Sequence, residues 1–119
     1  MDSASYKENE NAKPLNKPMM KWFGDQYFRS PADAKDVRID LVHAKLDKLP
    51  PTTIITAQID PLRSDGEALA GKLKDAGVDV SLKNYDGVTH EFFGMGAAVD
   101  VAKDAEVFAA DALKKAFGR

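Results

Sequence analysis

The sequence of 119 residues contains no cysteine. This absence excludes a disulfide framework, a thiolate nucleophile and any zinc site built on cysteine ligands. A chain without thiols fits a reducing compartment, so we expect a cytoplasmic location. Residues 1–11 are polar where a signal peptide would need a continuous apolar stretch, so nothing in them directs export.

Long apolar runs and an excess of basic residues are absent as well. No uninterrupted apolar stretch approaches the ~20 residues that cross a bilayer, so we expect no membrane span. The 17 basic and 19 acidic residues give a net charge of −2, without a Lys/Arg stripe. We therefore expect no nucleic acid partner. No recurring metal-ligand spacing occurs either, and we expect no metal or other cofactor.

What remains is the composition of an ordinary globular domain. Hydrophobic residues make up 44% and charged residues 30% of the chain, which disfavours wholesale disorder. A chain of 119 residues suits a single domain. Residues 1–14 are rich in Asn, Glu, Lys and Ser. We interpret them as a flexible tail that contributes no core, and assign residues 15–119 to the domain.

A first helix is predicted after Asn16, which can cap it, with Pro18 in its first turn. Apolar residues then recur at steps of three and four, which predicts an amphipathic helix ending near residue 30. Its aromatic residues are more typical of a core than of a ligand pocket. They are Trp22, Phe23, Tyr27 and Phe28. The conflicting signals in residues 31–51 predict a loop.

The middle of the chain has the pattern of an α/β fold. Residues 53–59 (TIITAQI) are typical of a strand covered on both faces in a parallel sheet. Ser64 and Glu67 have the spacing of a capping box, which predicts a helix from there to Gly77. Residues 78–85 alternate like a half-exposed edge strand. Together they predict a βαβ unit with parallel strands, flanked by the N-terminal helix and by a long helix over residues 98–117.

Two polar residues follow the predicted parallel strands. Asp60 comes directly after the first strand, and His90 lies in the loop after the second. Because neighbouring parallel strands lie ~4.8 Å apart and end at the same edge, we expect a carboxylate–imidazole pair. Such a carboxylate fixes the tautomer of an imidazole that acts as a general base. With Ser64 predicted as the helix cap, Asp60 has no structural role, which favours a catalytic one.

Other interpretations of these side chains remain open. Asp60 could cap a helix, and His90 could be a loop histidine with a backbone partner. Glu91 beside His90 would suggest a metal site with Asp60, but three scattered ligands are a weak signal for a metal. His43 has no carboxylate predicted opposite it, and we interpret it as a surface residue.

Four short segments carry a family resemblance. They are residues 19–23 (MMKWF), 49–51 (LPP), 56–66 (TAQIDPLRSDG) and 85–93 (YDGVTHEFF). These segments resemble the hormone-sensitive-lipase-like esterases of the α/β-hydrolase superfamily. The resemblance implies that Asp60 is the acid and His90 the histidine of a catalytic triad, in the chain order of this fold. It extends from about residue 15 onward, so residues 15–119 resemble the C-terminal part of an α/β-hydrolase domain.

The chain departs from the family pattern in two respects. Glu91 stands where the family usually has glycine. In addition, the 119 residues contain no Gly-x-Ser-x-Gly, so this chain includes neither the nucleophile elbow nor the His-Gly-Gly oxyanion segment of the family.

Two functions compete on this basis. One is part of a serine carboxylic ester hydrolase, an esterase or lipase acting on small esters, in which another segment supplies the nucleophile. The other is a non-catalytic truncated α/β module that folds or assembles without turnover. We expect the isolated chain to be inactive. We also expect it to form a homo-oligomer, because the strand over residues 53–59 would have one open edge and family members are expected to dimerise through their last strand and helix.

Overall fold

A computed structural model describes residues 2–118 of the chain. Most of the regular structure follows residue 51, and short helices dominate the part before it. The α-helices and strands are α1 (Ala4–Glu8), α2 (Lys17–Tyr27), β1 (Thr52–Ile59), α3 (Arg63–Asp75), β2 (Val80–Thr89) and α4 (Asp100–Ala116). The 3₁₀ helices are η1 (Pro31–Lys35), η2 (Leu41–His43) and η3 (Phe92–Gly94).

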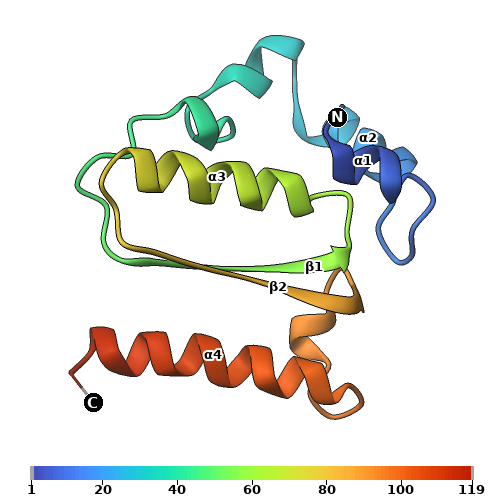
Figure 1. Cartoon of the computed structure of the whole chain (residues 1–119). Helices are drawn as coiled ribbons and strands as arrows, with labels where there is room; N and C mark the ends of the chain where they lie inside the picture. Colours follow the sequence, from blue (N-terminus) through green and yellow to red (C-terminus); the bar gives the residue numbers. More distant parts are fainter. Residues whose placement is uncertain (1, 119) are drawn as a thin grey trace.

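The two strands pair in parallel and form a two-stranded sheet, with α3 as the crossover between them. Figure 1 shows α3 on one face of this sheet and α4 on the other. The predicted α/β architecture, a βαβ unit with flanking helices, is confirmed. Gly77 has the left-handed φ of 79° that ends α3, as its position after the helical pattern predicts.

The main core lies between the sheet and α4. Its buried members are Ala57, Tyr85, Val88, Phe92, Ala102 and Ala105. Small alanine side chains let α4 approach the sheet closely, and Ala102 and Ala105 were predicted on its buried face. Leu113, predicted on the same face, is 58% exposed because it borders an open groove beside β1. On the opposite face of the sheet, Ala70 and Leu73 of α3 are buried.

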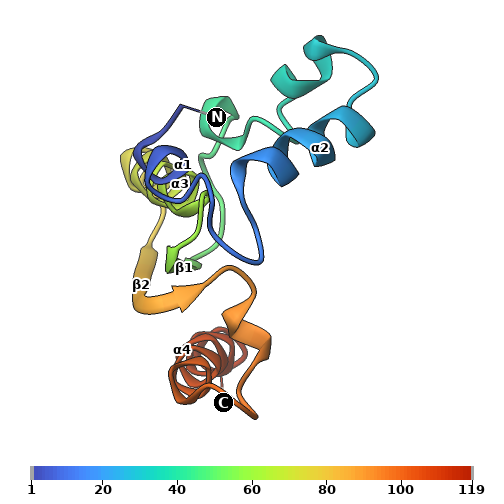
Figure 2. The same ribbon diagram turned by 90° about the vertical axis from the view of Figure 1, so that its right-hand side faces the viewer.

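Helix α2 begins as predicted and packs differently from the prediction. The side chain of Asn16 accepts a hydrogen bond from the Met19 amide at 2.9 Å, which confirms the predicted cap. However, Trp22 is 58% and Tyr27 72% exposed, so the prediction that the aromatic residues form a core is wrong for these side chains. Figure 2 shows the reason: α2 extends away from the sheet and from both of the helices that cover it.

The N-terminal segment is part of the packed structure. Residues 4–8 form α1, in which Ser5 and Tyr6 are buried. The prediction that residues 1–14 contribute no core is therefore wrong. The partners of α1 lie at the start of α3, and Ser64 is 59 positions beyond Ser5, so the composition of the segment itself gives no sign of this contact. Among the residues that the structure describes, no helix combines the length and apolar character needed to cross a bilayer.

Candidate active site

Asp60 and His90 meet at the carboxyl ends of the two parallel strands. Asp60 directly follows β1, and His90 directly follows β2, which extends to Thr89 and thus further than the predicted end at residue 85. His90 Nδ1 lies 2.8 Å from Asp60 Oδ2. The predicted hydrogen-bonded pair at this edge of the sheet is confirmed. The Asp60 side chain is 13% and the His90 side chain 32% exposed, so the acid is the more sheltered partner.

An irregularity in β2 sets the register that brings these two residues together. Ala57 pairs with Tyr85, and Ile59 pairs with Thr89, so β2 advances four residues where β1 advances two. Without the two extra residues, Ile59, the residue before Asp60, would lie opposite Gly87 and not opposite Thr89. Gly87 makes this possible because it adopts a left-handed φ of 72° and donates its amide to Gln58 Oε1 at 2.7 Å.

Asp60 also has a structural role, although Ser64 was predicted as the helix cap and Asp60 was predicted to have no structural role. Its Oδ1 accepts a hydrogen bond from the Leu62 amide at 2.8 Å, in the turn that leads into α3. The predicted capping box is wrong. Helix α3 begins at Arg63, and the side chain of its N-cap residue, Leu62, makes no capping hydrogen bond. Ser64 is engaged by Ser5 of α1 instead. Asp60 therefore holds both the turn and the imidazole.

Three polar residues around this turn were missed in the sequence analysis. Asn9 donates to the carbonyl oxygens of Asp60 and Gln58, Ser5 donates to that of Pro61, and Arg63 donates to that of Gln58. Ser5 and Asn9 are four residues apart, which places them on one face of a helical turn. That spacing was the only local signal available.

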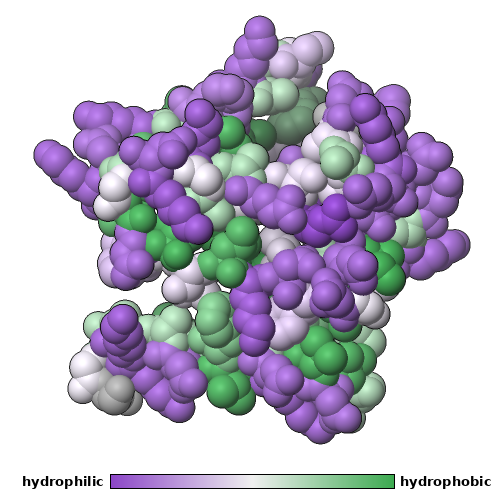
Figure 3. Space-filling view, in the orientation of Figure 1, coloured by the Kyte–Doolittle hydropathy of each residue, from purple (hydrophilic) through white to green (hydrophobic). Residues whose placement is uncertain are grey.

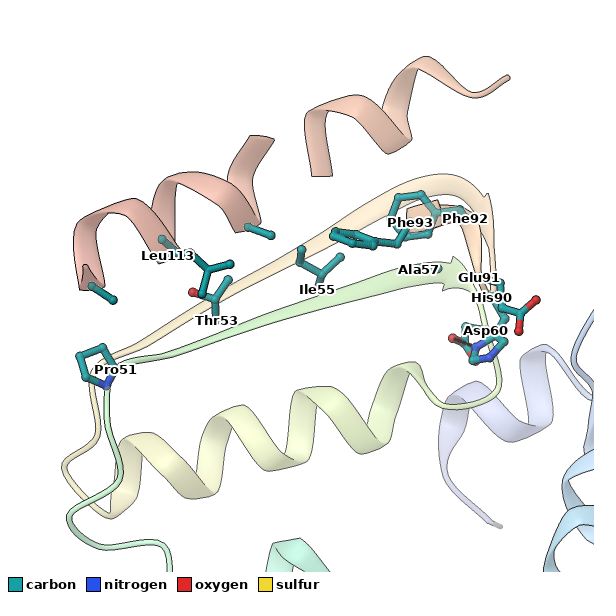
Figure 4. A pocket seen from close by; sticks show the side chains of 13 residues that line it. Pro51, Thr53, Ile55, Ala57, Asp60, His90, Glu91, Phe92, Phe93 and Leu113 are labelled. Atoms are coloured by element: carbon teal, nitrogen blue, oxygen red, sulfur yellow. Dashed lines mark hydrogen bonds and ion pairs between the residues drawn. The ribbon is translucent and has the colours of Figure 1, made fainter. Parts of the chain in front are cut away.

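An apolar groove of about 540 Å³ begins at the pair. Figure 4 shows Asp60 and His90 at one end, with Ala57, Ile55 and Thr53 following along β1 toward Leu113 of α4. The aromatic side chains of Phe92 and Phe93 border the same end as His90. A hydrophobic reactant lying in this groove would bring its polar centre to the imidazole.

Burial affects the titration of groups close to Asp60. It raises the pKa of Tyr6 to about 12, and repulsion by the carboxylates of Asp65 and Asp60 adds to the shift. Burial also raises the pKa of Asp65, and the neighbouring charge of Asp60 acts in the same direction. The Asp60 carboxylate thus stands in a partly desolvated region that disfavours further negative charge.

The other titratable residues considered from the sequence differ from this pair. His43 Nδ1 lies 2.8 Å from Asp40 Oδ1, a partner that was not predicted, and its side chain is 78% exposed. It is a surface residue, as interpreted. Within residues 2–118, no three His, Asp or Glu side chains are grouped closely enough to hold a metal ion, and this includes Asp60, His90 and Glu91.

The pair has the arrangement needed for general base catalysis. A carboxylate that accepts from Nδ1–H holds the neutral ring in one tautomer and leaves Nε2 to take a proton. The same carboxylate stabilises the imidazolium that forms. The elements that hold it are a strand end, a helix start and a strand irregularity, which are stiffer supports than a long loop.

Comparison with known proteins identifies relatives of the chain. The family described as the alpha/beta hydrolase fold matches residues 1–94 of the chain. The ethyl acetate hydrolase of Pseudomonas putida is 35% identical over 102 residues, which are 85% of this chain and 32% of that protein. The carboxylic ester hydrolase LipN of Mycobacterium tuberculosis is 39% identical over 83 residues, which are 68% of this chain and 22% of that protein.

Solved structures give the same result. A hyperthermophilic esterase from the archaeon Pyrobaculum calidifontis superposes with a TM-score of 0.91 at 35% identity, over 95% of this chain and 38% of that one. A thermophilic carboxylesterase cloned from a metagenomic library has a TM-score of 0.90 at 34% identity, over 95% of this chain and 39% of that one.

The chain thus spans about a third of the length of the relatives that it matches. Within that length, the family match covers β1, α3, β2 and both members of the Asp60–His90 pair. The fold and the family resemblance predicted from the sequence are confirmed, and the chain belongs to the alpha/beta hydrolase fold family.

Proposed function

We propose that this chain is part of a serine carboxylic ester hydrolase, in which Asp60 is the triad acid and His90 the general base. The observation that carries the proposal is the 2.8 Å contact between Asp60 Oδ2 and His90 Nδ1 at the carboxyl edge of the sheet. The 119 residues contain no Gly-x-Ser-x-Gly, so the serine nucleophile comes from a segment outside them.

In this mechanism each residue has a defined role. Asp60 accepts from Nδ1–H of His90, so Nε2 is the nitrogen that takes the proton of the serine hydroxyl as that oxygen attacks the ester carbonyl. The imidazolium then gives the proton to the leaving alcohol. The carboxylate of Asp60 stabilises the imidazolium in between. These steps need no metal or other cofactor.

The substrate class that we propose is small carboxylic esters. The names of two relatives, an ethyl acetate hydrolase and a carboxylic ester hydrolase, point to ester bonds. The groove beside His90 is lined mainly by apolar side chains, which suits an acyl or alkyl group better than a charged one. We also propose a cytoplasmic location, because the chain has no cysteine and so cannot form the disulfides common in oxidising compartments.

A chimera tests this function. The chain replaces the matching C-terminal part of the Pseudomonas putida ethyl acetate hydrolase, and hydrolysis of a short-chain aryl ester is followed. We expect turnover that His90→Ala abolishes and that Asp60→Asn lowers by about 10⁴-fold in kcat. His43→Ala is the matched control, since His43 also contacts an aspartate but lies outside the groove. A folded chimera without turnover would favour the non-catalytic module instead.

The isolated chain should show no appreciable esterase activity. An acid and a histidine without a nucleophile or oxyanion donors provide little catalysis, because electrostatic stabilisation of the oxyanion is usually the largest single contribution. The same aryl ester assay on the purified chain is the measurement. Saturable turnover that disappears with His90→Ala would contradict this expectation and point to an unrecognised nucleophile.

A further inference from the structure

The turn that carries Asp60, residues 58–64, has three backbone carbonyls that accept hydrogen bonds from the N-terminal segment. Asn9 meets two of them: its Nδ2 donates to Asp60 O at 3.3 Å and to Gln58 O at 3.4 Å. The Ser5 hydroxyl donates to a third carbonyl, that of Pro61, at 2.6 Å. Side chains from the N-terminal segment thus satisfy the acceptors on both sides of the catalytic acid.

Ser5 also binds the start of α3. Its Oγ accepts from the Ser64 amide at 3.0 Å, and its own amide donates to Ser64 Oγ at 3.1 Å. The first amides of a helix have no partner within the helix, so a hydroxyl that reaches one of them acts as a cap. Here the cap comes from α1. This reciprocal pair ties the end of the turn to α1, four residues beyond Asp60.

Two of these contacts, Ser5 Oγ to Pro61 O and Asn9 Nδ2 to Asp60 O, are buried, and the other three are partly buried. Ser5 is 0% and Asn9 9% exposed, and Pro61 is among the largest fully buried side chains. Asp60 O also accepts from the Arg63 amide at 3.2 Å and Gln58 O from the Arg63 guanidinium at 2.7 Å, so the loss of Asn9 removes its tie to the turn while both carbonyls keep a donor. A more exposed tie lies outside them, where Arg63 donates to Gln58 O at 2.7 Å and pairs with Glu8. Figure 2 shows α1 directly beside the start of α3.

We propose that α1 and Asn9 form a clamp that holds Asp60 in the position where it can orient His90, with Ser5 and Asn9 as positioning residues. The clamp acts on the backbone of residues 58–64 and so on the carboxylate that accepts from His90 Nδ1. This inference rests on the proposed function in one respect only, that Asp60 is the acid of the site.

The tautomer of His90 in the intact chain is the measurement. The chain has only two histidines, so side-chain ¹⁵N spectra of the neutral rings resolve both. In the unmodified chain we expect the His90 proton on Nδ1. Asn9→Ala should raise the ratio of the Nε2–H to the Nδ1–H form about three- to tenfold, because the carboxylate is then less firmly placed. Ser5→Ala should act in the same direction.

Two controls separate positioning from general damage. Asn11→Ala removes an exposed amide that donates to Glu10, so it should leave the His90 ratio unchanged. His43, whose imidazole contacts Asp40 and not the turn at residues 58–64, should keep its tautomer in every variant. Asn9→Asp keeps the shape of the side chain but replaces the donor by an acceptor, and should shift His90 at least as far as Asn9→Ala.

The outcomes are distinct. A shift at His90 alone in folded Asn9 variants supports the clamp. An unchanged ratio in folded variants overturns the clamp and leaves the proposed function intact, whereas an Nε2–H form in the unmodified chain would count against Asp60 as the acid. If neither Asn9 variant folds, residue 9 supports the domain as a whole and the positioning role is rejected.

Discussion

Asp60 uses its two carboxylate oxygens for different purposes. Oδ2 accepts from His90, and Oδ1 accepts from the Leu62 amide within the turn. A change at this position therefore alters both the orientation of the imidazole and the start of α3. Loss of activity in Asp60→Asn reports the first effect only if the free energy of unfolding is measured alongside it. His90→Ala tests the imidazole alone, because in the described residues its side chain has no hydrogen bond besides the one to Asp60.

Glu91 occupies a backbone position that suits glycine. Its φ of 67° is left-handed, which is unfavourable for residues with a Cβ. The family resemblance puts glycine there. Glu91→Gly should raise the free energy of unfolding by about 0.5–1 kcal/mol, after the greater freedom of glycine in the unfolded chain is subtracted. Urea denaturation measures this. Glu91→Ala removes the same charge but keeps a Cβ, so an equal gain in that variant would refute the backbone explanation.

Tyr6 should make the free energy of unfolding fall in alkali. Its pKa is about 12 in the folded chain against 10.0 for an ordinary tyrosine, so the folded state holds the proton more tightly. Its contribution is complete below pH 10 and is lost as the pH rises from 10 to 12. The loss should reach about 2–3 kcal/mol at most. Urea titrations across this range measure it, and Tyr6→Phe should remove this part of the pH dependence.

At the scale of elements, α3 contains two glycines with opposite surroundings. A Cβ on Gly66 would lie 2.8 Å from Thr56 Cγ2 of β1, whereas a Cβ on Gly71 would meet nothing within 4 Å. Gly66 therefore lets the helix approach the strand that leads to Asp60. Gly71 lies on the exposed side of the helix.

Alanine at these two positions should have opposite effects. Gly71→Ala should stabilise the chain by about 1 kcal/mol through helix propensity alone. Gly66→Ala should destabilise it by about 1–2 kcal/mol, because the overpacked contact with a buried threonine outweighs the gain in propensity. The free energies of unfolding of the two variants give the comparison. Similar stabilisation by both would mean that α3 can move away from β1 at little cost.

The elements that could be predicted from the sequence are those with local periodicity. The β-branched run of β1, the Asn16 cap of α2 and the alanines of α4 each carry their signal within a few residues. The cap of α3 could not be predicted, because its donor and acceptor come from Ser5, 59 residues away. The prediction that the aromatic residues of α2 form a core failed for a related reason. The spacing of residues shows that one face of a helix is apolar, but it does not show what covers that face.

The candidate site was predictable for its two central residues. Parallel strands end at one edge, so topology alone paired Asp60 with His90. The irregularity at Gly87 that sets their register was read as a loop, because glycine after an aspartate is an ordinary turn signal. The contacts between α1 and the turn that carries Asp60 could not be predicted, because a short polar segment acquires a role only through its tertiary contacts.

At the scale of the whole molecule, the two edges of the sheet differ. β2 carries Lys83 and Asp86, charges that discourage pairing with another chain, whereas β1 carries no charged residue at all. Figure 3 shows hydrophobic side chains reaching the surface between the helical layers. An uncharged open strand beside an apolar groove is a template for association.

We expect the purified chain to self-associate at micromolar concentration, most simply as a symmetric dimer. Sedimentation or light scattering gives the mass. Leu113→Glu, which places a charge in the groove beside β1, should shift the chain toward monomer. Val107→Glu is the matched control, because Val107 is 59% exposed on the same helix, close to the 58% of Leu113, but does not line the groove. A folded monomer throughout this range would refute the expectation.

The contacts of α1 also have a consequence for the order of folding. The βαβ unit closes when residues 28 apart meet, as Thr56 and Asn84 do, whereas the Ser5–Ser64 contact must close a loop of 59 residues. Each doubling of loop length costs about 0.6 kcal/mol more in chain entropy, and α1 has only a short helix to offset it. We therefore expect the strands and α3 to form before α1 docks. The turn that carries Asp60 should then be the last part of the site to become fixed and the first to open in local unfolding.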